Sequence, residues 1–219
     1  MSFRSFISAS KEAILLKLRA RYNKSKRFRL KNSNPTIITR NCMAGIIYHD
    51  LGLRFNSPTV NLSMDNEDFI VFLENFNAFL EEDPIPSAEH KNGYPEGELK
   101  LKSKSVHINF VHYKTFEEAL SKWKQRIKRI DPDNMYIIWE VSNEYGPDIG
   151  LYKRFCDLPF KNKILITGKK FPESAKNIVK MGIYNSKYHY GKILEYCSFP
   201  FSYKRYLNRF DYVKFLNSK

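Results

Sequence analysis

Two hydrophobic patterns alternate along the chain after Pro35. Short runs rich in β-branched and aromatic residues are typical of strands, and stretches in which apolar residues recur every three or four positions are typical of amphipathic helices. The predicted strands span residues 36–41, 58–64, 98–101, 105–111, 135–141 and 163–167. The predicted helices span residues 43–51, 67–82, 115–130, 148–156 and 203–216.

Two of the predicted strands, residues 135–141 and 163–167, are almost continuously apolar. A strand of this kind is covered on both faces, as in a parallel sheet between two layers of helices. The alternation of strands and helices therefore predicts an α/β fold with three layers, a mostly parallel sheet and helices on both of its faces. We expect residues 35–219 to form a single α/β domain, with a long loop over residues 83–97, where three prolines and two glycines occur.

The start of the chain has a different pattern and carries most of the positive charge. Ile7, Ile14 and Leu18 recur at helical spacing, so residues 1–34 are predicted to form a basic amphipathic helical arm. Residues 1–31 contain ten basic side chains and one acidic side chain, which gives +9 of the chain's net charge of +14. The charge of the protein therefore belongs mainly to this arm.

Three roles for the basic arm stay open. It can lie on an anionic membrane surface or bind a membrane protein, because each cation near charged headgroups contributes about 1 kcal/mol. It can bind nucleic acid phosphates, although the absence of a recognition motif disfavours nucleic acid as the partner. It can also be an ordinary helix that packs Leu15 and Leu18 on the domain and leaves its cations in water.

The composition fits an intracellular globular protein. Of the 219 residues, 42% are hydrophobic and 15% aromatic, and no apolar run approaches the roughly 20 residues that cross a bilayer. Cys42, Cys156 and Cys197 lie far apart and lack the spacing of a zinc site. We therefore expect a cytoplasmic protein with reduced thiols, located at the inner face of the membrane if the arm docks there. The chain contains no motif for nucleotide or metal binding, so the sequence assigns neither a metal nor a cofactor.

Cys42 is the strongest candidate for chemistry. It directly follows a predicted strand and begins a predicted helix. Ligands bind at the carboxyl ends of strands in open α/β sheets, and a helix N-terminus favours a thiolate. Cys42 is therefore predicted to be a nucleophile or a substrate contact. The alternative is a small buried side chain with no part in chemistry.

His112 and two arginines are further candidates. His112 ends a predicted strand on the rim that we expect to carry Cys42, and histidine titrates near neutral pH, as a general base requires. Arg126 and Arg129 are three residues apart on one helix face, so they can together hold a carboxylate or a phosphate. The alternatives are a histidine that is satisfied by the backbone and arginines that lie in water.

Two blocks of short motifs follow one another between Pro35 and Thr167. The first block is TIITRNCMAG at residues 36–45, LGL at residues 51–53 and NSPT at residues 56–59. The second block includes His112-Tyr113, Lys122-Trp123, Arg126 and Arg129-Ile130. In this order the motifs resemble the DUF1919 family of bacterial proteins.

The resemblance implies an α/β fold and a site around Cys42, with Asn41, Gly45 and Ser57 as further site residues and His112 as a neighbour. Members of the family are often labelled exopolysaccharide biosynthesis proteins or acetyltransferases. The resemblance therefore implies a role in the assembly of a surface polysaccharide.

Our leading hypothesis is a transferase that acts on a sugar or an activated sugar donor. Cys42 and His112 would form its thiol/imidazole pair, and Arg126 and Arg129 would hold an anionic part of the substrate. The rival hypothesis is a module without catalytic activity that docks through the basic helix on a membrane-bound polysaccharide synthesis complex.

Overall fold

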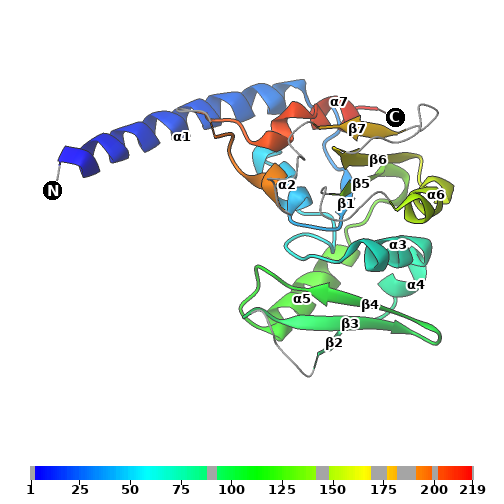
Figure 1. Cartoon of the computed structure of the whole chain (residues 1–219). Coiled ribbons are helices and arrows are strands. Elements are labelled where there is room, and N and C mark those ends of the chain that lie inside the picture. Colours follow the sequence, from blue (N-terminus) through cyan, green and yellow to red (C-terminus); the bar gives the residue numbers. More distant parts are fainter. Residues whose placement is uncertain are drawn as a thin grey trace.

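A parallel sheet lies at the centre of the protein, whose structure is a computed structural model (Figure 1). The structure describes residues 3–87, 93–141, 148–168, 177–181, 191–198 and 202–218, with side chains from residue 10 onward. Within these residues the strands follow the order β1 (Thr36–Thr39), β5 (Met135–Val141), β6 (Asn162–Thr167) and β7 (Ile178–Lys180). Each strand pairs with the next in parallel, which confirms the predicted α/β fold.

Helices cover both faces of this sheet. The described part of the whole chain contains the helices α1 (Phe3–Arg29), α2 (Met43–Leu51), α3 (Asn66–Glu74), α4 (Phe76–Leu80), α5 (Phe116–Ile127), α6 (Ile149–Asp157) and α7 (Tyr212–Leu216). It also contains short 3-10 turns at Pro132–Asn134, Lys192–Leu194 and Tyr206–Arg209. Successive strand residues point to opposite faces of a sheet. Tyr136 and Ile138 of β5 therefore pack with α2 and α7, whereas Ile137 and Trp139 pack with α3 and α6. The three predicted layers are confirmed.

A second sheet was not predicted. It is antiparallel and consists, within the described residues, of β2 (Ile85–Pro86), β3 (Glu96–Leu101) and β4 (Lys104–Asn109). Lys102 and Ser103 alone connect β3 to β4, and a connection of this length forms a hairpin, because parallel strands need a crossover of about a dozen residues or more. The strands predicted in this region are thus present, but they lie outside the parallel sheet.

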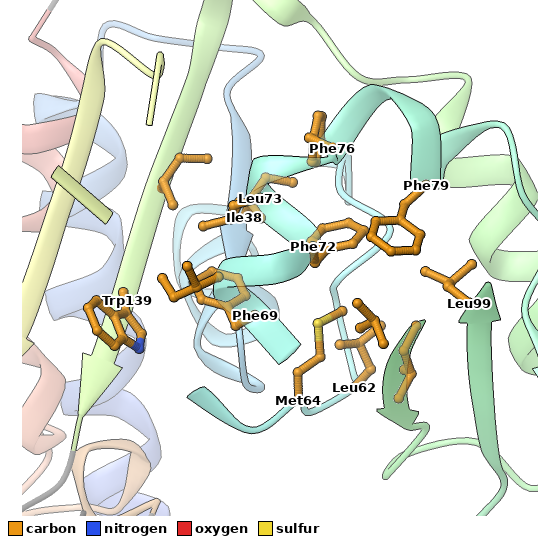
Figure 2. Close-up of a cluster of buried hydrophobic side chains, with 14 of the residues drawn as sticks. Ile38, Leu62, Met64, Phe69, Phe72, Leu73, Phe76, Phe79, Leu99 and Trp139 are labelled. Carbon is orange, nitrogen blue, oxygen red and sulfur yellow. The ribbon is translucent and has the colours of Figure 1, made fainter. Parts of the chain in front are cut away.

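Helices α3 and α4 lie between the two sheets and join them into one core. Leu73 lies beside Ile38 of β1, and Phe72 and Phe79 lie toward Leu99 of β3 (Figure 2). The rings of Phe72 and Phe79 are stacked, with their centroids 6.1 Å apart. Each of these side chains belongs to a single buried cluster, so the antiparallel sheet shares its core with the parallel one.

The strand predicted over residues 58–64 is wrong. Asn61 has a φ of 68°, in the left-handed region that interrupts an extended backbone. Ser63 forms an isolated antiparallel bridge with Asn109, and Met64 N donates to Arg40 O at 2.9 Å. The segment is therefore a turn that is held at both sheets by hydrogen bonds and not a strand within either of them.

Two predicted helices are each divided in the structure. The helix predicted over residues 67–82 becomes α3 and α4, because Asn75 leaves helical geometry at a φ of −120° and its Nδ2 donates to Val71 O at 2.8 Å. The helix predicted over residues 203–216 becomes a 3-10 turn and α7, which begins after Asp211, whose side chain accepts from Lys214 N at 3.1 Å. The apolar pattern continues across both breaks, so the pattern alone does not locate them.

Helix α1 has two halves with different surroundings. Its first half extends beyond the rest of the protein, and its second half lies on the protein near α2 and α7 (Figure 1). In the second half, Lys26 Nζ donates to Asp50 Oδ2 at 2.8 Å and to Tyr212 OH at 2.5 Å, and Asn23 Nδ2 donates to Asp50 Oδ1 at 3.0 Å. The predicted helix is confirmed, but it is not a separate arm along its whole length. Within the described residues, no helix is both long enough and apolar enough to cross a bilayer.

Candidate functional site at the carboxyl edge of the parallel sheet

Cys42 lies where the sequence predicts it, between the end of β1 and the start of α2. Its side chain is half-buried and is a free thiol. Burial raises the pKa of this thiol to about 11, because a buried thiolate loses its hydration. Burial therefore disfavours the predicted thiolate and favours the neutral thiol at pH 7.

Asn41 connects β1, β5 and α2 through both ends of its buried amide. Its Nδ2 donates to Glu140 Oε2 at 2.9 Å, and its Oδ1 accepts from Met43 N at 3.0 Å. Thr39 Oγ1 donates to Asn41 O at 2.6 Å and accepts from Ala44 N at 3.3 Å. These bonds fix the turn that carries Cys42, so the geometry gives Asn41 a positioning role beside its predicted contact with substrate.

Arg40 and Glu140 form a buried ion pair that the sequence analysis missed. Arg40 Nε donates to Glu140 O at 2.7 Å, and Arg40 Nη2 lies 3.9 Å from Glu140 Oε2. Arg40 Nη1 also donates to Met64 O at 2.9 Å. The two side chains are 3% and 1% exposed, so the pair is withdrawn from water at the ends of two adjacent strands. The signal in the sequence was a single charged residue in the otherwise apolar strand MYIIWEV.

Ser57 and Gly45 pack within the protein around this edge. Ser57 is fully buried, and its hydroxyl lies 2.9 Å from Thr59 Oγ1, which in turn accepts from Thr39 N at 3.2 Å. A methyl group on Gly45 would lie 3.0 Å from Asn61 Oδ1, which leaves no room for a larger residue. The structure thus gives both residues a packing role, and their predicted contact with substrate stays a prediction.

His112 does not end a strand of the parallel sheet, as the sequence pattern predicted, and its role as a general base stays a prediction. His112 is exposed and follows β4, which belongs to the antiparallel sheet. Because β4 pairs with β3, its end is not one of the carboxyl ends of the parallel sheet. The other histidine of this region, His107, has its Nε2 at 3.3 Å from Glu96 Oε2 within the same hairpin.

Arg126 is buried on α5, with its guanidinium against the segment that follows α2. Its Nη1 donates to Val60 O at 2.8 Å and to Tyr113 OH at 2.5 Å, and its Cζ lies 5.4 Å from the centre of the Phe55 ring. Among the residues that the structure describes, no carboxylate forms an ion pair with Arg126. Arg126 is 6% exposed, so the alternative of an arginine in open water is wrong here.

Arg54 and Arg129 lie near Arg126, and we refer to these three residues as the arginine cluster. Arg129 is half-buried, and its Nη1 donates to Phe55 O at 3.1 Å, whereas Arg54 is exposed. Burial lowers the pKa of Arg129, and the charges of Arg54 and Arg126 lower it further. Three guanidinium groups close together create a positive potential that favours an anion such as a phosphate or a carboxylate.

Tyr113 and Val60 connect the arginine cluster to Cys42. The Tyr113 hydroxyl donates to Val60 O at 3.1 Å while it accepts from Arg126. Burial raises the pKa of Tyr113 and Arg126 lowers it, and smaller effects of Glu118 and Cys42 raise it, so the Tyr113 hydroxyl lies within electrostatic range of Cys42. Val60 in turn packs on the first turn of α2, where a methyl group on Gly45 would lie 3.3 Å from Val60 Cγ1. These contacts connect Arg126 to the first turn of α2, which follows Cys42, and the sequence analysis missed Tyr113.

No metal centre emerges from the part of the chain that the structure describes, since no three or more histidine, cysteine, aspartate or glutamate side chains converge there. What the candidate site offers is one neutral thiol, one tyrosine hydroxyl and a group of guanidinium donors. These groups suit a ligand that has both hydroxyl groups and an anionic part.

Comparisons with known proteins agree with the order of motifs. The family DUF1919, described as a domain of unknown function, matches residues 15–217. An uncharacterized protein of Haemophilus influenzae is 32% identical over 209 residues, which cover 92% of this chain and 97% of that protein. The similarity thus extends beyond the segment from Pro35 to Thr167 and includes the second half of α1 and α7.

Proposed function

The chain belongs to the DUF1919 family, and from this premise we propose that it is a transferase that acts on a sugar through an activated, phosphate-bearing donor. The observation that carries the proposal is the buried Arg126 guanidinium, which no carboxylate of the described residues neutralises and which lies next to Arg54 and Arg129. We propose a sugar as the group that is transferred because the resemblance of the motifs implies a role in the assembly of a surface polysaccharide.

Physical chemistry favours an anion at the arginine cluster. A buried charge is costly when no opposite charge accompanies it, so a bound phosphate would offset the cost of burying Arg126. Guanidinium groups suit this task, because their N–H donors match two phosphate oxygens at once. Arg129 and Arg54 would hold the outer part of the same phosphate group.

The same arrangement suits the transfer step. When a sugar leaves a phosphate donor, the bond between the anomeric carbon and the phosphate oxygen breaks and negative charge grows on the departing phosphate. Fixed guanidinium donors stabilise that charge without reorganisation. Cys42, as a neutral thiol near Tyr113, is proposed as a contact to the sugar and not as a thiolate nucleophile.

The test is calorimetric titration of the protein with a panel of UDP-, GDP- and CMP-linked sugars. We expect at least one donor to bind. We expect Arg129→Gln to weaken its binding about 10-fold or more, because hydrogen bonds to charged groups contribute about 1.5–3 kcal/mol. Lys122→Gln is the matched control, because it removes the same charge from an exposed position on α5. Arg126→Gln should abolish binding, with its melting curve recorded beside it.

A second measurement separates an enzyme from a binding protein. Water can replace the acceptor, so a transferase slowly releases nucleotide from a bound donor. Nucleotide release by the wild type, and not by Arg126→Gln, is the expected result. The proposal fails if no donor of the panel binds, if Arg129→Gln and Lys122→Gln behave alike, or if a donor binds and stays intact.

A further inference from the structure

One side of α1 presents cations and apolar side chains to the solvent. Ile14, Lys17, Arg21, Lys24 and Phe28 recur at intervals of three or four residues, so they lie on one face of the helix, which we call the outer stripe. All five are exposed, and Phe28 is 93% exposed. The outer stripe is roughly 21 Å long at 1.5 Å per residue.

The opposite side of α1 is used to hold the helix on the protein. Leu15 and Lys26 are buried, and Lys26 pairs with Asp50. Arg19 pairs with Glu12 at 2.7 Å and lies 3.8 Å from the centre of the Tyr196 ring. The basic residues of α1 therefore fall into two groups, of which one is engaged within the protein and the other faces outward.

No acidic side chain in the described part of the chain pairs with Lys17, Arg21 or Lys24. The outer stripe lies mainly along the second half of α1, on the side of the helix opposite to the buried Leu15 and Lys26. An extended positive surface with apolar side chains among its cations is therefore open to a partner.

We propose that the outer stripe docks this protein on an anionic lipid bilayer, with α1 lying in the plane of the interface. The cations meet the negative headgroups, and Ile14 and Phe28 enter the boundary with the acyl chains. Nucleic acid would use the cations alone and would leave Ile14 and Phe28 in water. The apolar members of the stripe therefore favour the bilayer.

This inference does not rest on the proposed transferase function. Donor binding is measured without lipid, and docking is measured without a sugar donor, so either can fail alone. If both hold, they place a sugar-transfer site beside a membrane, where a lipid-linked acceptor would be within reach.

The test is sedimentation of the full chain with vesicles of phosphatidylcholine alone or of phosphatidylcholine mixed with phosphatidylglycerol. The first variant reverses the three cations of the stripe (Lys17→Glu, Arg21→Glu, Lys24→Glu). Its matched control reverses three exposed lysines elsewhere (Lys102→Glu, Lys122→Glu, Lys128→Glu), so both have the same net charge. A second variant, Ile14→Ser with Phe28→Ser, removes the apolar members only. Far-UV circular dichroism confirms that each variant is folded.

We expect the wild type to sediment with the anionic vesicles only, and less so as salt rises from about 0.1 M to about 1 M. Reversal of the three charges of the outer stripe should lower the partition coefficient for anionic vesicles at least about 100-fold, which corresponds to about 3 kcal/mol for three cations. The control variant should lower this coefficient far less. The serine variant should bind more weakly than the wild type at every salt concentration.

Several results would overturn the proposal. They are equal losses in the stripe variant and its control, wild-type binding to neutral vesicles as strong as to anionic ones, or undiminished binding by the serine variant. Binding to a duplex DNA oligonucleotide that is lost with the stripe, while vesicle binding is absent, would assign the surface to nucleic acid.

Discussion

Cys42 and Cys156 differ in exposure, and that difference reverses the reactivity that the sequence pattern suggests. Cys156 is exposed on α6, whereas Cys42 is half-buried at the start of α2. A helix N-terminus lowers the pKa of a thiol only if the thiolate keeps enough hydration. For Cys42 burial raises the pKa to about 11.

The first prediction follows from this pKa. At pH 7 only about one Cys42 side chain in ten thousand is a thiolate. Iodoacetamide should therefore label Cys156 first, and the rate at Cys42 should rise about 10-fold for each pH unit up to about pH 10. Mass spectrometry of digested protein after timed labelling measures both rates. Faster labelling of Cys42 than of Cys156 at pH 7 would show that the site stabilises the thiolate after all.

At the scale of elements, local signals were the most informative. The predicted limits of α2 and β5 are confirmed, because Gly52 adopts a left-handed conformation that ends α2 and because β5 is apolar except for Glu140 and is buried along its whole length. The start of α5 is also confirmed, since the Thr115 side chain accepts from Glu118 N at 3.2 Å. Each of these signals acts over a few residues, which is why the sequence reveals it.

The contacts between elements were less visible in the sequence. Arg40 and Glu140 are 100 residues apart, and they become partners only because β1 pairs with β5. Asn41 was predicted as a site residue, but its bond to Glu140 depends on the same pairing. The candidate site was therefore found at the correct strand end, whereas the ion pair beneath it was not.

The second prediction tests this ion pair between β1 and β5. Glu140→Gln removes the carboxylate and leaves a buried guanidinium, which should lower the free energy of unfolding by about 3 kcal/mol. Arg154→Gln is the control, because Arg154 pairs with Glu67 and Glu74 at the surface and should cost less than about 1 kcal/mol. Urea denaturation of both variants measures the two losses. Equal losses of unfolding free energy would mean that the buried pair of Arg40 and Glu140 stabilises the protein no more than the surface pairs of Arg154.

At the scale of the whole molecule, the layers were predictable and the second sheet was not. Apolar strands that alternate with helices predict three layers whichever strands become neighbours. The position of His112 depends on which sheet β4 joins, and the hairpin with β3 decides that. The wrong placement of the strand before His112 in the parallel sheet thus comes from strand pairing, which the alternating pattern does not specify.

The attachment of α1 also emerges only in the folded molecule. If residues 1–34 formed a separate arm, as the sequence pattern predicts, the domain over residues 35–219 would fold without residues 1–31. In the structure Lys26 is 4% exposed, and its ammonium group bonds Asp50 and Tyr212 from two different helices. Asn32 Nδ2 also donates to Leu216 O at 3.0 Å, so the chain that follows α1 is held by α7 as well.

The last prediction separates the two halves of α1 by truncation. Removal of residues 1–14 takes away the extension and leaves Leu15, where the similarity to the family begins. We expect the melting temperature of this variant to stay within about 2 °C of the wild type. Removal of residues 1–31 leaves the Asp50 carboxylate buried without Lys26, which costs about 3–5 kcal/mol.

In a protein of this length each kcal/mol lowers the melting temperature by about 2–4 °C, so the longer truncation should lower it by about 6–20 °C. Differential scanning calorimetry of both truncations at equal concentration measures the two shifts. Lys26→Met serves as the matched point variant, because it removes only the charge and should reproduce a large part of the longer truncation's effect. If the longer truncation melts like the wild type, α1 is a separate arm along its whole length, and Asp50 accommodates its charge without Lys26.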